Sequence, residues 1–382
     1  MYHRIPVSLA MLPAAAWILL CLALPAFAED VPPPLAIPVG NVTLQTAGKL
    51  PEDALLDVGL AIFSPGIPID AASHSKMGIF PEIRKAEAQF IPVYLRQVLV
   101  ASGGWGVVRV LPDADASYEL LITGKIRRSD GLQLVLQIRA ADATGRLWLD
   151  KTYTDETAQS DYPVAAGDDP YADLYRQVAN DLLQFRLGLS RSQLQEIREV
   201  ALMRYAADLS QDAFGGYLEA DAMGIYKLVR LPAQGDPMMA RVERIRSQQH
   251  LFIDTVDEQY VDLYEEMAPT YNLWRQYGRE QALYQADYQA RASSRERYGR
   301  RGTFAAMEQT YSAYRLLKIQ EQDLDEMALG FNNEVLPTAM EVSGRVFRLN
   351  GTLTSQYTEW RSILREIFAL ETGLPPASPA AQ

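Results

Sequence analysis

The sequence predicts an α+β fold, with a small N-terminal mixed sheet that has helices on one face. A mainly α-helical domain follows, and a short strand and helix end the chain. Three observations support this. Apolar runs and alternating segments lie among stretches of helical spacing in residues 57–187. Long charged and tyrosine-rich segments fill residues 190–335, and residues 336–372 return to a strand pattern and then a helix pattern.

The first 28 residues have the pattern of a cleavable secretory signal peptide. Arg4 precedes an almost wholly apolar run from Val7 to Leu24, and Ala26-Phe27-Ala28 has the form of a cleavage site. Pro13 interrupts the run, which favours cleavage over a retained membrane anchor. We therefore expect export to the periplasm, with the mature protein either free there or associated with the outer membrane.

The single cysteine, Cys21, lies inside this apolar run, and Ile18-Leu19-Leu20 before it lack the small residue of a lipidation signal. The mature chain therefore has no disulfide, no thiolate metal ligand and no cysteine nucleophile. Its stability must come from a packed core, and with 48% hydrophobic residues the chain is long enough for about two domains.

The charge of the chain excludes two classes of partner. The net charge of −12 becomes −13 when residues 1–28 are removed, because they contain one arginine and no acid. A protein this acidic is not expected to bind nucleic acid or to adsorb on anionic lipid. No later segment has 18 uninterrupted apolar residues, so we expect no transmembrane span after signal cleavage.

Residues 29–56 are rich in proline and predict an extended N-terminal arm or tether. In the module of residues 57–187, the Gly103-Gly104 pair ends a helix and Asp130-Gly131 joins two strands as a hairpin. The strands that we expect there cover 58–63, 107–111, 118–127, 132–140 and 146–153. The helices that we expect cover 81–102, split at Pro92, and 169–187.

The second part, residues 190–335, is predicted to be a helical domain. Ser190 is an expected N-cap with Gln193 at the capping-box position. The expected helices cover 190–208, 210–226, 236–268, 270–298 and 303–331. The dense tyrosines of this region indicate core packing rather than a binding groove. Residues 336–372 form a coda with a strand over 342–349 and a helix over 354–370, and residues 373–382 are an expected disordered tail.

The segment from Leu95 to Tyr153 resembles a known module. It contains a helix ending in "ASGGW", a strand "GVVRVLP", then "ADASYELLITGKI" and "LQLVLQIRAADATGRLWLDKTY". This order is similar to the N-terminal module of curli-secretion-channel lipoproteins, penicillin-binding-protein activator lipoproteins and the TolB N-terminal domain. Segments after residue 230 resemble an exported protein family of Gram-negative bacteria. These resemblances imply a compartment and an architecture, and they imply no activity.

Few residues offer catalytic chemistry. Only His74 and His250 remain after signal removal, and neither lies beside a nucleophile pattern or the further ligands that zinc needs. Both are interpreted as surface or packing histidines. The glycines of Gly103 to Gly106 follow a helix, whereas a phosphate-binding loop precedes one. We therefore expect no catalytic, cofactor-binding or metal-binding residues and no cofactor.

Asp254, Asp257 and Glu258 fall on one face of an expected helix. Paired carboxylates across a cleft hydrolyse glycosides. The favoured interpretation is a solvated face whose acids pair with nearby arginines of the same segment. Those arginines are Arg241, Arg244 and Arg246.

An arginine cluster is the sharpest local departure from the acidic composition. It consists of Arg291, Arg295, Arg297, Arg300 and Arg301. Arginines near a helix C-terminus are favoured by the helix dipole, but a cluster this dense also suits docking to an anionic partner.

These observations together predict a non-enzymatic periplasmic envelope protein, which is either a protein–protein adaptor or an accessory factor in assembly or export. One alternative is a cell-wall glycan hydrolase that uses the acidic helix residues. Another is a subunit of an outer-membrane secretion or assembly apparatus, which oligomerisation would distinguish. The sequence leaves the identity of the envelope partner and the oligomeric state open.

Overall fold

The computed structural model describes residues 37–74, 79–165, 167–233, 235–293 and 337–374, and short pieces between 311 and 329. All of them belong to one compact unit. The expected signal peptide, residues 29–36 of the arm and residues 375–382 of the tail lie outside the described residues. The side chains of residues 285 and 287–293 lie outside them as well.

A five-stranded mixed sheet forms the N-terminal part, with strand order β2-β1-β3-β4-β5. Strand β1 is parallel to β2 and β3, whereas β3, β4 and β5 are antiparallel. The predicted small mixed sheet is therefore confirmed. The strands are β1 (Val58–Ala61), β2 (Val108–Leu111), β3 (Leu120–Ser129), β4 (Gln133–Asp142) and β5 (Leu147–Glu156).

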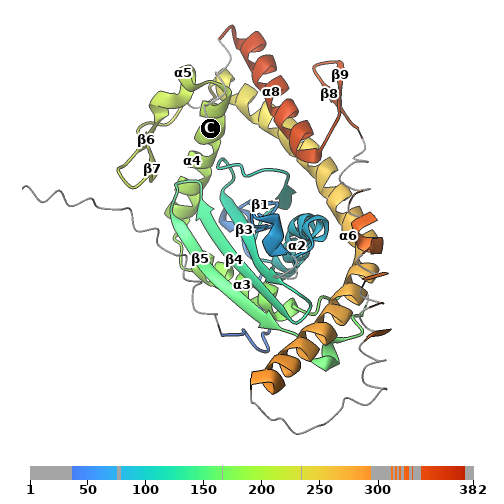
Figure 1. Cartoon of the computed structure of the whole chain (residues 1–382). Coiled ribbons are helices and arrows are strands. Elements are labelled where there is room, and N and C mark those ends of the chain that lie inside the picture. Colours follow the sequence, from blue (N-terminus) through green and yellow to red (C-terminus); the bar gives the residue numbers. More distant parts are fainter. Residues whose placement is uncertain are drawn as a thin grey trace, which may run out of the picture. The chain divides into compact units, whose positions relative to one another are not determined.

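Helices α2 (Pro81–Ser102) and α3 (Ala172–Leu187) pack against one face of this sheet (Figure 1). The alternation in β4 explains this face, because Leu134, Leu136 and Ile138 are fully buried while Arg139 is exposed. The short elements η1 (Glu52–Ala54), α1 (Ala71–His74) and η3 (Gln159–Asp161) lie in the connections. The expected split of the first helix is wrong, since α2 runs through Pro92. Its neighbours Ile91 and Val93 are buried, so packing outweighs the hydrogen bond that proline removes.

Helix α4 (Arg191–Leu209) begins at the predicted capping box, where Ser190 Oγ accepts a hydrogen bond from Gln193 N at 3.3 Å. The expected helix over 210–226 is wrong. Its place is taken by α5 (Gln211–Phe214), η4 (Gly215–Tyr217) and a hairpin of β6 (Leu218–Ala220) and β7 (Tyr226–Leu228). Asp221 directs the hairpin turn, because its carboxylate accepts hydrogen bonds from the N–H groups of Met223 and Ile225.

A single helix, α6 (Pro237–Ser293), replaces the two helices expected on either side of Pro269. Packing explains why the helix continues through Pro269, since Met267 and Tyr271 on either side of the proline are buried. Tyr260 and Tyr264 are buried as well, so the predicted core role is confirmed for these tyrosines, whereas Tyr284 and Tyr311 are exposed. The described residues between 311 and 329 are helical.

The coda contains two strands where one was expected over 342–349. Strands β8 (Thr338–Val342) and β9 (Arg345–Leu349) form a hairpin, and α8 (Leu353–Thr372) follows. Ser343 and Gly344 both have positive φ, at 51° and 75°, which makes the tight turn that the alternation pattern does not reveal.

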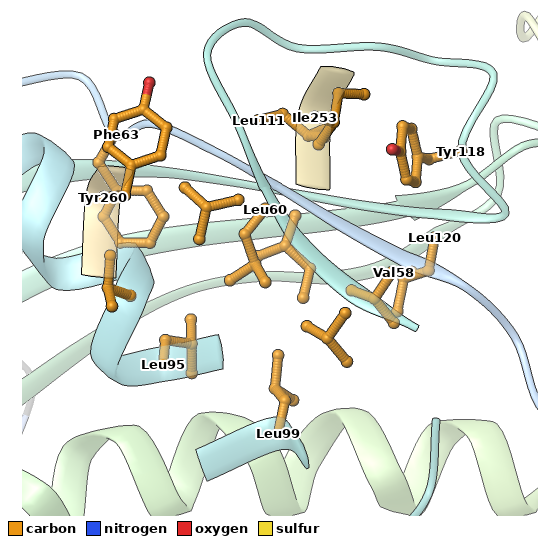
Figure 2. Packing of buried hydrophobic residues seen from close by; sticks show 14 of the residues in the cluster. Val58, Leu60, Phe63, Leu95, Leu99, Leu111, Tyr118, Leu120, Ile253 and Tyr260 are labelled. Carbon is orange, nitrogen blue, oxygen red and sulfur yellow. The ribbon is translucent and has the colours of Figure 1, made fainter. Parts of the chain in front are cut away.

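One hydrophobic core extends from the sheet into the later helices. Figure 2 shows Ile253 and Tyr260 of α6 in the same cluster as Leu60 of β1. Within the part of the chain that the structure describes, no helix is long and apolar enough to span a membrane.

Candidate functional site

The acids singled out on the long helix bind the sheet module. Asp254 accepts from Arg109 of β2, with Nε and Oδ1 2.6 Å apart. Asp257 pairs with Arg96 of α2 at 2.9 Å, while Glu258 is exposed. The expected pairing of these acids with arginines of their own segment is wrong. Arg241 contacts the Met238 sulfur, Arg244 pairs with Glu371, and Arg246 donates to the Ser117 carbonyl.

Asp257 also closes one edge of the sheet. Its Oδ1 accepts a hydrogen bond from the backbone N–H of Val110 at 3.2 Å, so a side chain of α6 takes the place of a neighbouring strand beside β2. Burial raises the pKa of Asp257, and Arg96 opposes this effect. The acidic face of α6 is therefore a docking contact within the chain.

The two histidines have structural surroundings. The His250 ring lies 5.9 Å from the Tyr118 ring, centre to centre. Burial lowers its pKa to about 4, and Arg109 and Arg246 act in the same direction. His250 is therefore a neutral packing histidine at pH 7. His74 Nε2 lies 2.7 Å from the carbonyl oxygen of Pro68, within its own loop.

The arginine cluster falls largely outside what the structure describes. Arg291 lies in the last turn of α6, and its side chain is outside the described residues. The rest of the cluster, Arg295, Arg297, Arg300 and Arg301, is also outside them. Docking at this cluster therefore stays a prediction.

The structure contains a pocket that the sequence did not reveal, with a volume of about 520 Å³. It lies where the arm, the end of β5 and the start of α3 meet, and we call it the acidic pocket. Six carboxylates and one arginine are among its lining residues. These are Asp155, Glu156, Asp161, Asp168, Asp169, Asp173 and Arg176.

Asp155 and Asp169 are the most buried carboxylates of this pocket, and each residue is 6% exposed. The Asp155 Oδ1 accepts from Glu156 N at 2.9 Å and its Oδ2 accepts from Leu174 N, in the first turn of α3, at 3.3 Å. Burial, together with the charges of Asp173 and Asp161, raises the pKa of Asp155 to about 7, although the two backbone hydrogen bonds oppose the shift. The charge of the acidic pocket therefore changes near neutral pH.

The N-terminal arm forms one wall of the acidic pocket. Val39 N donates to the carbonyl of Thr154 in β5 at 2.9 Å, and Val42 N donates to Asp173 Oδ1 at 3.0 Å. Gly40, between them, lines the pocket. From residue 37 onward, the segment predicted to be an extended arm is thus fixed along β5 and α3.

A buried ion pair holds one residue of the pocket lining. Asp169, which lines the pocket, binds Arg275 of α6 at 2.7 Å. The guanidinium also lies over the Tyr271 ring, 3.9 Å from its centre. Asp169 therefore joins the lining of the pocket to α6.

The signal for this pocket was present as acid-rich composition. The segments "TDETAQSDY" and "GDDPYAD" connect the last strand of the sheet to its helix. Composition alone does not show that both segments face the arm at residue 40, more than 100 positions earlier. In the described residues, no group of three histidine, cysteine or acidic side chains is arranged to hold a metal ion.

Comparison with protein-family models, curated proteins and solved structures finds no match to this chain. The resemblance of residues 95–153 to the curli and TolB modules therefore stays an expectation.

Proposed function

We propose that this chain is a non-enzymatic periplasmic envelope protein that acts as a protein–protein adaptor, with the acidic pocket as a docking site for a cationic group of its partner. One observation carries the proposal: the pocket gathers six carboxylates, of which Asp169 and Asp173 are paired with arginines. Such a site favours cations through its field. The acids of α6 that a hydrolase would use, Asp254 and Asp257, are engaged by arginines.

The alternative function is a cell-wall glycan hydrolase, and the carboxylates that could serve it lie in this pocket rather than on α6. Asp155, whose pKa is raised to about 7, has the property of a general acid. Asp161 and Asp173 lie in the same pocket as candidates for the second carboxylate. Loss of sugar release from purified cell wall in the Asp155→Asn protein would establish the hydrolase and end the adaptor proposal.

The adaptor proposal is tested in intact cells. A photoreactive residue at Ser160, which is exposed on the pocket lining, is expected to crosslink one defined partner from the periplasm. Replacing Asp161 and Asp168 by asparagine should remove that crosslink. The control is the same photoreactive residue at Arg139, which is exposed on β4 away from the helices. Capture of the same proteins at both positions, or with and without the two acids, would contradict the proposal.

Export is tested by the intact mass of the periplasmic protein. We expect a mature chain that starts at Glu29, after the Ala26-Phe27-Ala28 site. A mass that retains residues 1–28, or that includes a lipid on Cys21, would overturn this expectation. The rival reading of an outer-membrane apparatus subunit predicts a stable oligomer, which the same preparation reveals by light scattering.

A further inference from the structure

The two edges of the sheet differ. The edge at β2 is closed by Asp257 of α6. At the other edge, β5 pairs only with β4, and it is ten residues long. Among the described residues, one backbone hydrogen bond reaches its outer side, from Val39 N to the Thr154 carbonyl.

The register of β5 determines which backbone groups are open. In an antiparallel strand, alternate residues direct both backbone groups to the same side. The Thr154 carbonyl points outward to the arm, so the backbone groups of Thr152 and Asp150 point outward as well. In the described part of the chain, no hydrogen bond reaches these backbone groups of Asp150 and Thr152 from outside the sheet.

Two of the usual protections of a sheet edge are weak in β5. Edge strands commonly carry proline or a projecting lysine, which keep other strands away. Strand β5 contains no proline, and its only lysine, Lys151, is turned onto α3. The Lys151 ammonium binds Asp181 at 2.9 Å and lies over the Tyr153 ring. The edge is therefore open to another strand.

Charge indicates the kind of strand that fits. Asp150 on the edge is exposed, and Glu156 at the end of β5 is exposed at the acidic pocket. The arm shows that an extended segment is accommodated here, since Val39 binds β5 and Gly40 lines the pocket. A basic extended segment would therefore meet Asp150 on the edge and Glu156 at its end.

We propose that the outer edge of β5, at Asp150 and Thr152, receives an extended basic segment of a partner protein as an added strand, with a cationic side chain directed to the acidic pocket. The segment would bind through its backbone to the edge, and its charge would select it. The proposal rests on the adaptor function and adds the docking surface and the chemistry of the partner.

The probe is an end-capped synthetic peptide of five Thr-Lys repeats, and its counterpart has five Thr-Glu repeats. We expect the basic peptide to bind the full mature chain, measured by fluorescence anisotropy, and the acidic peptide to bind at least about tenfold more weakly. The basic peptide should also slow hydrogen exchange at the amides of Asp150 and Thr152. Equal binding of both peptides, or of neither, would overturn the proposal.

Thr152→Pro removes an outward donor and places a ring where the added strand would lie. Proline is tolerated at an edge when its nitrogen faces outward, so pairing with β4 and the melting temperature should be kept. We expect about tenfold weaker binding of the basic peptide. Thr152→Val keeps the donor and should bind as the unchanged protein does.

The outcomes separate this proposal from the adaptor function. If Thr152→Pro keeps its melting temperature and binds the basic peptide as tightly as Thr152→Val does, charge alone attracts the peptide and the added strand is refuted. Peptide binding and amide protection without a crosslinked partner in cells would refute the adaptor and leave the edge site standing. A crosslinked partner that Thr152→Pro still captures fully would refute the edge site alone.

Discussion

The guanidinium of Arg275 lies 2.7 Å from the carboxylate of Asp169, with the two side chains 0% and 2% exposed. One residue belongs to α6 and the other to the connection before α3, which are more than 100 positions apart in the chain. Their pairing, with Tyr271 and Tyr171 rings around the cation, sets where the long helix crosses the sheet module. Asp169 also lines the acidic pocket, so this contact joins the pocket lining to α6.

Arg275→Leu is expected to lower the free energy of unfolding by about 3–5 kcal/mol, because it leaves the Asp169 carboxylate buried without its partner. Urea denaturation measures the change. Lys85→Leu is the matched control: it breaks the more exposed pair with Glu82. That pair is expected to contribute about 0–1 kcal/mol. Similar losses in the two variants would mean that the Arg275 pair is not a buried anchor.

Leu136→Asp is expected to unfold the sheet module. Leu136 is 0% exposed, and an unpaired buried carboxylate costs several kcal/mol, which is comparable to a total stability of about 5–15 kcal/mol. Gln137→Asp points to the opposite face, where Arg127 lies 2.6 Å from the Gln137 side chain and can pair with the new acid. Its effect should be mild. Thermal melting compares the two, and equal melting temperatures would refute this assignment of faces.

The sequence correctly predicted the features of the fold that adjacent residues determine. The alternation around Leu136, the Asp130-Gly131 turn and the Ser190 cap each depend on a few adjacent residues, and the structure has all three. Pro92 and Pro269 misled the prediction because proline is a local signal. Both helices are held through their prolines by contacts with distant parts of the chain.

The candidate site was less predictable than the fold. The spacing of Asp254 and Asp257 predicts that they share a helix face, but their partners Arg109 and Arg96 lie in another part of the sequence and only folding brings them together. The acidic pocket depends on the arm reaching the end of β5, and no periodicity encodes that approach. Residues that form a site across long sequence separations carry no local pattern.

Stability should depend on pH through Asp155. Its pKa is raised from 3.8 to about 7 by burial, so between these values the folded protein keeps a proton that the unfolded chain has released. The stability that Asp155 contributes is full below the unfolded pKa and is lost as the pH rises through about 7. As the pH rises from 4 to 8, the urea concentration at the midpoint of unfolding should therefore fall less in the Asp155→Asn variant than in the unchanged protein.

Glu156→Gln is the control for this titration, since it removes an exposed carboxylate from the same pocket. It should keep the pH dependence of the unchanged protein. If Asp155→Asn and the unchanged protein lose stability in parallel across this range, then Asp155 does not hold its proton in the folded state.

The arginine cluster is expected to serve docking and to add little to stability. Five arginines lie between Arg291 and Arg301, and like charges this close in sequence repel one another, by a few tenths of a kcal/mol per pair when they share a helix face. A chain with net charge −12 has acids enough to disperse them, so their concentration suggests an external anion. Surface ion pairs contribute about 0–1 kcal/mol, so replacing Arg295, Arg297 and Arg300 with glutamine should barely change the melting temperature.

In the same triple variant, crosslinking to the anionic partner should be lost, or its residual binding should become insensitive to salt. A triple variant that melts far lower and still captures the same partner would instead identify the cluster as an internal hub of ion pairs.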